Sequence, residues 1–432
     1  MTAKAFFPVL LLVPFVGAGE ELTLPQALEL ALRGPAVQAA KAAAQAEAAR
    51  VDQAQAWRLP HVEVEAQARG LTRDPGFLVP RGAFGNPFPL ALVTGEREVQ
   101  TGRLTVSQLV WDWRRTGLAV DAAKAQAAAA EAQARAVRQE VARATVEAFA
   151  QAWGATGQLQ AALEAQKAAV ETLRVVRAMV QQGLLPKSDE LAAQFLVQQR
   201  EAEAARAQAA LEGSLAVLSE LTGVAVTGVT VGEGIFEAFG RVPMDGAVQR
   251  PELEVLRRQK EALDAAARAY RRENWPVLAA VGGIDHVRDS YYLHQTNGFG
   301  AVVLKASLFD GGQSRARVAE LASQRNAVTS KLEATERAVE REMAVAEAKE
   351  KAARQALAAA EKAVAAAEEE VRLETLRHGQ GLATTRDLLQ AQEHLAAARA
   401  AVAQSQAALL SALAEKVAAA GEDFVAVFGG GR

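Results

Sequence analysis

Apolar side chains in the second half of the chain recur at helical spacing over a long run without a breaker. No Gly or Pro occurs from Gln313 to His378. The large apolar positions step by seven and four residues through Leu321, Val328, Leu332, Val339 and Met343, and by seven through Leu357, Val364 and Val371. These steps give narrow apolar seams on a helix. The spacing therefore predicts a helix of roughly 70 residues, about 100 Å long.

The faces between the seams decide how such a helix packs. Ala permits close approach of a neighbour, and Glu, Lys, Arg and Gln cover the wet surfaces. A helix that is wet on two sides suits the wall of a tube. A solvated two-stranded coiled coil is the alternative.

The pattern occurs twice. A helical run opens at Pro35 and ends at Pro60, and a second opens at Pro251 and ends at Pro276. Each is followed by two candidate strands and then by a long helical run with a turn. Only the loop between the strands differs in length, by 18 residues, and the longer one, at 74–94, is predicted to be an exposed loop.

Two pairs of aspartates mark the repeat. Asp112 and Asp310 stand at matching strand ends, and 77 positions separate each from the aspartate of its turn, Asp189 or Asp387. We therefore divide the chain into a signal peptide (1–19), a first repeat (20–223) with its turn near 183–189, an irregular linker (224–250), a second repeat (251–420) with its turn near 379–387, and a tail (421–432).

The candidate strands predict a membrane barrel. From His61 to Arg69 small apolar residues alternate with charged or polar ones, as in a strand with one lipid face and one watery face. Four strands cannot close a barrel, and open sheet edges are not tolerated in lipid. Two copies would give eight strands and a nearly filled interior, whereas three give twelve strands and room for a water channel. Aromatic residues flank these strands and predict an interfacial belt, with ordinary packing as the alternative: Trp111, Trp113, Tyr291, Tyr292 and Phe299.

The junction between strand and helix has its own signature. The apolar stretch 306–309, taken as the end of a strand, meets Asp310, Gly311 and Gly312 directly before the long helix. Two glycines let a strand turn abruptly into a helix. After Asp112, Trp113 and Arg114 occupy the two corresponding positions, so the sequence offers no account of that first corner.

Composition excludes most other classes of function. Half of the 432 residues are hydrophobic and only 5% are aromatic, which suits long Ala-rich packed helices. A net charge of −3 gives no support to nucleic-acid binding. The chain has no Cys, its five His form no metal motif, and the two glycines of the corner lack the Lys of a phosphate loop. We expect no enzyme activity, no cofactor and no metal.

The N-terminus predicts export. Lys4 precedes the apolar run 6–16, and the small residues Gly17, Ala18 and Gly19 follow it, as in a secretory signal with cleavage near Ala18 or Gly19. An uncleaved anchor is the alternative, but the run is shorter than the ~20 residues that a bilayer requires.

The order of four motifs resembles one family. LTLPQALELALRGP, the RLP that ends the first helical run, SLFDGG and GLATTRDLLQAQ are similar to those of TolC-like outer-membrane efflux proteins, from about Glu21 to Gly421. The resemblance implies a mainly helical protein with a small transmembrane β part. In it, a long helical tunnel continues into a 12-stranded barrel shared by three protomers.

The same resemblance implies roles for the two turns. Gly183 with Leu184, and Gly381 with Leu382, fit the family's turn motif, with Gln182 and Gln380 in place of its valine. These residues would contact a periplasmic adaptor protein, while four others would line or lock the periplasmic entrance: Asp189, Asp387, Ser188 and Arg386. Ala383 and Gln390 depart from the family's entrance residues, and Arg386 or Arg377 would substitute for the missing arginine. Read from the residues alone, each aspartate forms part of a carboxylate ring at the pore, caps or flanks the returning helix, or does both.

The resemblance therefore implies a homotrimeric channel in the outer membrane, with a periplasmic helical extension and lipid around its strands. The resemblance implies that it serves as the passive exit duct of an inner-membrane transporter, in a tripartite efflux or type I secretion system. A periplasmic coiled-coil scaffold or adaptor without a channel is the alternative.

Overall fold

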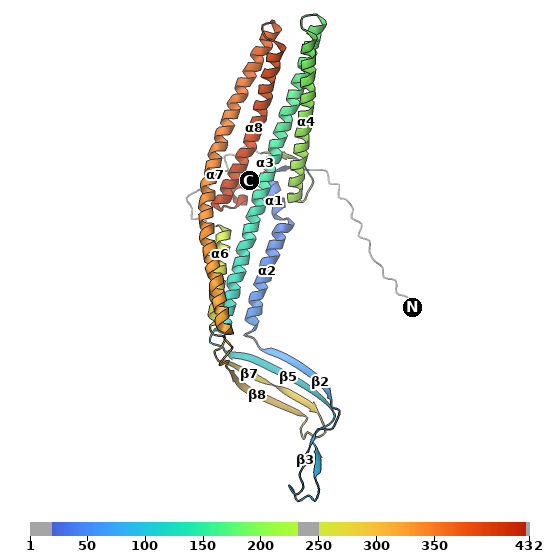
Figure 1. The fold of residues 1–432 in the computed structure, drawn as a ribbon, viewed down its shortest axis with the longest axis vertical. Coiled ribbons are helices and arrows are strands. Elements are labelled where there is room, and N and C mark those ends of the chain that lie inside the picture. Colours follow the sequence, from blue (N-terminus) through green and yellow to red (C-terminus); the bar gives the residue numbers. More distant parts are fainter. Residues whose placement is uncertain (1–19, 232–249, 429–432) are drawn as a thin grey trace, which may run out of the picture. The chain divides into compact units, whose positions relative to one another are not determined.

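The computed structural model describes residues 20–231 and 250–428 (Figure 1). The predicted signal peptide and most of the predicted linker lie outside the described residues. The elements, in order, are β1 (Glu20–Thr23), α1 (Leu24–Leu32), α2 (Pro35–Ala56), β2 (His61–Gly70), β3 (Gly76–Val79), β4 (Leu90–Val93), β5 (Glu98–Trp111), α3 (Arg115–Gln181), α4 (Lys187–Thr222), β6 (Val226–Thr230), α6 (Pro251–Tyr270), β7 (Val277–Arg288), β8 (Thr296–Lys305), α7 (Gln313–Gly379), α8 (Thr385–Ala420) and α9 (Phe424–Phe428).

The long helices come in pairs of equal length. Both α3 and α7 have 67 residues, and both α4 and α8 have 36. The side chains of the α7 seams, from Leu321 to Val371, are all buried or half-buried, as the spacing predicted. No helix within residues 20–231 and 250–428 combines the length and the apolar character needed to cross a membrane.

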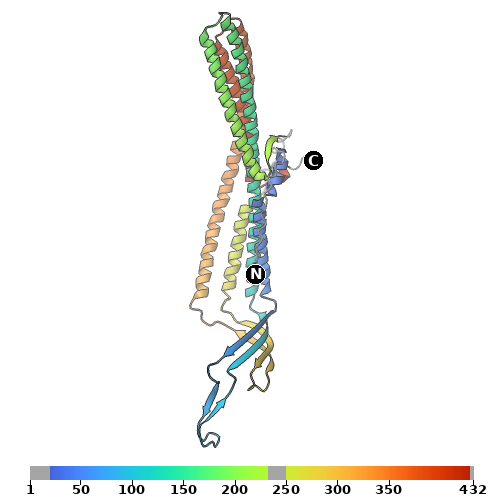
Figure 2. The ribbon, with the colours of Figure 1, turned by 90° about the vertical axis from the view of Figure 1, so that its right-hand side faces the viewer.

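The chain folds as two units, described here one at a time. Unit 1 contains 1–41, 134–251 and 335–432, and unit 2 contains 42–133 and 252–334. In unit 1, α4, α8 and the adjoining parts of α3 and α7 form a bundle of helices (Figure 2). Its core lies where α1 packs on the bundle, and includes Leu24, Leu28, Val146, Phe149, Leu218, Leu410, Leu413 and Val417.

Two short elements complete the unit 1 core. β1 pairs in parallel with β6, and Phe424 of α9 is fully buried in the same cluster. β6 falls in the segment predicted to be an irregular linker, and α9 in the segment predicted to be a tail. Five-residue segments such as β6 and α9 are too short to show a hydrophobic period, so only tertiary packing reveals them.

Unit 2 contains an antiparallel sheet in the order β2-β5-β7-β8. All ten residues of β2 and all ten of β8 are exposed in a single protomer. β2 and β8 are the edges of this sheet, and each pairs with one strand only. One chain therefore provides an open sheet with solvent on both faces.

One expectation for the strands is wrong, and another is incomplete. β8 ends at Lys305, so 306–309 is not part of a strand. Lys305 pairs with Val277, the first residue of β7. Pro276 precedes Val277 and has no N–H with which to extend the pairing. The loop 74–94 contains the hairpin β3-β4, in which Gly76 pairs with Val93. Most of the loop is exposed, as predicted, and its four prolines all lie outside the two strands.

Candidate functional site

The two turns between the long helices of unit 1 have the same geometry. Gly183 and Gly381 adopt φ angles of 74° and 73°, in the left-handed region. In the first turn, the Gly183 amide donates to Val180 O at 3.0 Å and the Leu184 amide to Met179 O at 2.9 Å. The second turn repeats this Schellman pattern around Gly381 and Leu382.

Each glycine is followed by an exposed leucine. Leu184 and Leu382 are 68% and 66% exposed, although a leucine at this place in a Schellman turn often packs back on its helix. Each turn thus presents one unpacked apolar side chain in the protomer. The two glycines and the two leucines are the four residues for which the resemblance implied contact with an adaptor protein.

Asp387 is a helix cap. Its amide donates to Thr384 Oγ1 at 3.2 Å, and its carboxylate accepts from the Thr384 amide at 2.9 Å, which forms a capping box at the start of α8. The hydroxyl and then the amide of Thr384 hold the pKa of the Asp387 carboxyl below its usual value, with smaller contributions from Arg377 and Arg386. The cap is therefore present, and a place for Asp387 in a carboxylate ring, which is compatible with the cap, stays a prediction.

Asp189 instead joins the two hairpins. Its carboxylate accepts a hydrogen bond of 2.7 Å from the Thr385 hydroxyl, 196 positions away in the sequence. The N-cap of α4 is Pro186, and no side chain caps that end. Asp189 therefore contributes its charge to the first turn of α4 while its carboxylate holds α8.

A buried histidine extends this contact. His378 Nε2 lies 3.2 Å from the Thr385 hydroxyl oxygen, and both side chains are buried. Because the single hydroxyl proton goes to the Asp189 carboxylate, Nε2 must carry the hydrogen that it shares with Thr385. The three side chains form one chain of hydrogen bonds, the Asp189–Thr385–His378 contact, of which only Asp189 was predicted as a site residue.

The first turn has a buried charged group of its own, Glu190, which was not among the predicted site residues. Glu190 accepts from Arg177 at 3.2 Å and from Lys187, and its side chain is only 9% exposed. The hydrogen bond from Lys187, followed by that from Arg177, lowers the pKa of the Glu190 carboxyl. Ser188 and Arg386, the remaining candidates for the entrance, are exposed.

The corners of unit 2 share one backbone conformation. Gly311 and Gly312 have φ angles of 66° and 88°, and Trp113 and Arg114 have 54° and 64° at the two corresponding positions. The first corner is therefore the same left-handed turn, made without glycine at a cost of about 1–2 kcal/mol per residue.

An aspartate caps the helix after each corner. Asp112 accepts from the Thr116 amide at 2.5 Å. Asp310 accepts from the Gly312 amide, the Ser314 amide and Asn274 at 2.9–3.0 Å, and from the Ser314 hydroxyl. The Ser314 hydroxyl, Asn274 and the two amides together hold the pKa of the Asp310 carboxyl well below its usual value.

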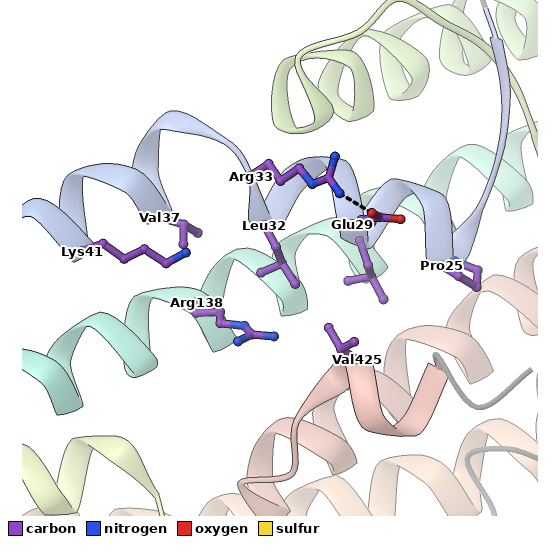
Figure 3. A pocket seen from close by; sticks show the side chains of 9 residues that line it. Pro25, Glu29, Leu32, Arg33, Val37, Lys41, Arg138 and Val425 are labelled. Atoms are coloured by element: carbon purple, nitrogen blue, oxygen red, sulfur yellow. Dashed lines mark hydrogen bonds and ion pairs between the residues drawn. The ribbon is translucent and has the colours of Figure 1, made fainter.

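A small cavity beside α1 has no counterpart among the predicted sites. It has a volume of about 280 Å³, and Figure 3 shows apolar side chains of α1, α2 and α9 facing it, with Arg33, Lys41 and Arg138 at its rim. Arg33 pairs with Glu29 at 2.5 Å, and Arg138 with Asp423 at 3.5 Å. Among residues 20–231 and 250–428, no group of His, Asp and Glu side chains could hold a metal ion.

Comparison with solved structures identifies the fold. The outer membrane protein VceC from Vibrio cholerae is similar with a TM-score of 0.76 and 20% identity, over 93% of this chain and 96% of that one. The CmeC outer membrane channel from Campylobacter jejuni gives 0.76 and 17%, over 92% and 85%. The MtrE outer membrane channel from Neisseria gonorrhoeae gives 0.73 and 18%, over 92% and 89%.

Comparison of sequences identifies the family. A search of curated protein sequences finds no match to this chain. The family model described as outer membrane efflux protein matches residues 27–224 and 245–422, which include both repeats with their corners and turns. The chain therefore belongs to the outer membrane efflux protein family, the TolC-like trimeric efflux channels of the outer membrane.

Proposed function

We propose that three copies of this chain form a passive exit duct, whose periplasmic entrance the Asp189–Thr385–His378 contact keeps closed. The contact supports this proposal because it ties the turn of one helical hairpin to the turn of the other. A tube walled by such hairpins can widen only if the hairpins move apart. A bond between their ends opposes that movement.

The open sheet supports the trimer. Each protomer contributes four strands with two unpaired edges, and lipid does not tolerate such edges. Three sheets give twelve strands, which leave room for water along the axis. The helical scaffold without a channel, given above as the alternative, provides no role for a sheet exposed on both faces.

Removal of one hydroxyl tests the closed contact. Thr385→Val keeps the size of the side chain and removes both hydrogen bonds, so reconstituted channels are expected to open more often and to pass more current across planar lipid bilayers. Thr375→Val is the matched control, because the Thr375 hydroxyl bonds only to Val371 O of its own helix. Equal currents from the wild type and both variants would contradict the proposed role of the contact.

The two exposed leucines support docking of a periplasmic adaptor. An exposed leucine between two helix ends offers apolar surface, and a partner that covers it gains the free energy of removing that surface from water. We expect Leu184→Ala and Leu382→Ala, together, to weaken copurification of the cognate adaptor and its inner-membrane transporter without changing the conductance of the channel. Leu373→Ala, on the exposed side of α7, is the control. Unchanged adaptor recovery would exclude these leucines as anchors.

A further inference from the structure

Four of the five tryptophans gather at the corner of unit 2 where strands meet helices: Trp57, Trp111, Trp113 and Trp275. Three of them form a ladder of edge-to-face contacts. The ring centroids of Trp111 and Trp113 are 5.9 Å apart, and those of Trp113 and Trp275 are 5.7 Å apart. These three side chains are nevertheless 43–56% exposed in the protomer. The ladder is therefore a surface, not a core.

Two arginines accompany the ladder. The Arg272 guanidinium lies 5.8 Å from the ring of Trp275 and donates to Trp113 O at 2.9 Å. The Arg114 side chain is 76% exposed and forms only a long ion pair, of 3.8 Å, with the half-exposed Asp121, so its guanidinium still faces solvent. The carboxylates of both corners, Asp112 and Asp310, are occupied by helix amides. The ladder therefore carries positive charge beside aromatic rings.

The backbone at this corner indicates that the side chains have a role of their own. Trp113 and Arg114 occupy left-handed conformations that favour glycine, and the second corner of the same chain makes the same turn with two glycines. A turn alone does not require a tryptophan and an arginine there. Strain of this kind is typical of positions whose side chains bind something.

We propose that Trp111, Trp113, Arg114, Arg272 and Trp275, the tryptophan–arginine patch, bind the headgroup of an anionic phospholipid. Trp111 ends β5 and Trp275 precedes β7, and these strands are neighbours in the sheet. In an outer-membrane channel the ends of the strands lie at the membrane surface, where tryptophans reside at headgroup level. Guanidinium groups bind phosphate through paired charge-assisted hydrogen bonds.

The charge of the patch favours lipid over other occupants. A phospholipid supplies an apolar chain for the rings and a phosphate for Arg114 and Arg272 at the same time. Free phosphate would use the arginines alone, and a second copy of the chain would use the rings. An anionic phospholipid is therefore the ligand that uses both the rings and the arginines. Its binding rests on the proposed function, because the sheet must be inserted in the membrane.

The test measures lipid retention by the purified trimer. The protein is placed in nanodiscs of phosphatidylcholine with a minor fraction of phosphatidylglycerol, and the lipids kept after transfer to detergent are counted by native mass spectrometry. The wild type is expected to retain phosphatidylglycerol selectively. Arg272→Gln should lower that selectivity about tenfold, which corresponds to one charge-assisted interaction of about 1.4 kcal/mol.

Two further variants make the result specific. The double variant Trp113→Gly with Arg114→Gly copies the second corner, so it should fold and conduct normally while it loses the selectivity. Arg69→Gln, at the opposite end of β2, should retain it. Inorganic phosphate added to the wild type should not displace the lipid.

Three results would overturn the proposal. Selectivity unchanged in Arg272→Gln and in the double variant would exclude the patch as the binding site. Displacement by inorganic phosphate would make it a simple anion site, and dissociation of the trimer in the double variant would make it a contact between copies. Failure of the wild type to insert into bilayers would instead contradict the channel function itself, so the two failures are distinguishable.

Discussion

At the scale of single residues, the two corners of the sheet show one backbone problem solved in two ways. Gly311 and Gly312 enter the left-handed region without penalty, whereas Trp113 and Arg114 enter it against their preference. At both corners an aspartate caps the following helix by accepting a hydrogen bond from a backbone amide of its first turn. The cap is therefore the common requirement, and the glycines are only one way to reach it.

Replacement of the cap in the second corner should destabilise the fold in a pH-dependent way. The pKa of Asp310 is lowered in the folded state, so its contribution to stability is complete at neutral pH and is lost only as the pH falls through that lowered value. Asp310→Asn should therefore melt at a lower temperature than the wild type at neutral pH. The difference should persist through mild acid and shrink in strong acid.

Circular dichroism at several pH values measures this difference in detergent. Asp52→Asn, on the exposed face of α2, is the control and should melt like the wild type throughout. A melting temperature of Asp310→Asn equal to that of the wild type at neutral pH would mean that the four hydrogen bonds to this carboxylate do not stabilise the corner.

At the scale of elements, the close approach of α3 and α8 in unit 1 depends on two glycines of α3. A Cβ atom added at Gly154 would lie 2.6 Å from the Cβ of Ala407, and one added at Gly157 would lie 2.7 Å from the Cβ of Ala403. Both partners belong to α8. The absence of side chains at these two positions therefore sets the distance between α3 and α8.

One substitution made at two glycines separates packing from helix propensity. Gly154→Ala should destabilise the protein by about 1–3 kcal/mol, because Ala407 must move. Gly213→Ala, in α4, has nothing within 4 Å of the new Cβ and should stabilise by about 0.5–1 kcal/mol. Thermal unfolding of both variants, with Gly154→Ala plus Ala407→Gly as the rescue, provides the measurement. Destabilisation that the second change does not reverse would exclude the close approach as its cause.

The sequence predicted the long helices correctly and missed the short strands, because a spacing pattern needs many residues to be recognised. The α7 seams repeat over enough turns for spacing alone to predict the helix, and the turns were found because glycines recur at matching positions. The β3-β4 hairpin was missed because each of its strands has only four residues and directly follows a proline. Thr385 and His378 were missed because only tertiary packing brings Asp189 to them.

At the scale of the whole molecule, the sequence predicts a sheet that a single chain cannot close into a barrel. Repeated helix-strand-strand units and alternation in β2 predicted a sheet that one chain cannot close, and the sheet indeed ends at β2 and β8. The family to which the chain belongs forms trimeric channels. Which residues of β2 meet which residues of β8 in a neighbour is a matter of register, and neither edge fixes it within a protomer.

Cross-linking of the two edges tests the shared barrel directly. The natural chain has no cysteine, so introduced pairs have no competing partner. Val64→Cys on β2, combined in turn with single cysteines at Thr296, Gly298, Gly300 and Val302 of β8, samples the possible registers. A disulfide requires Cα atoms about 4.4–6.8 Å apart, so only variants near the true register can form it. Under oxidation in membranes, these variants should give a covalent trimer on a denaturing gel, and a reductant should return it to monomers. Val64→Cys alone is the control for contacts that do not involve β8. Covalent products no larger than dimers, or only monomers for every cysteine pair after oxidation, would contradict a barrel closed by three sheets.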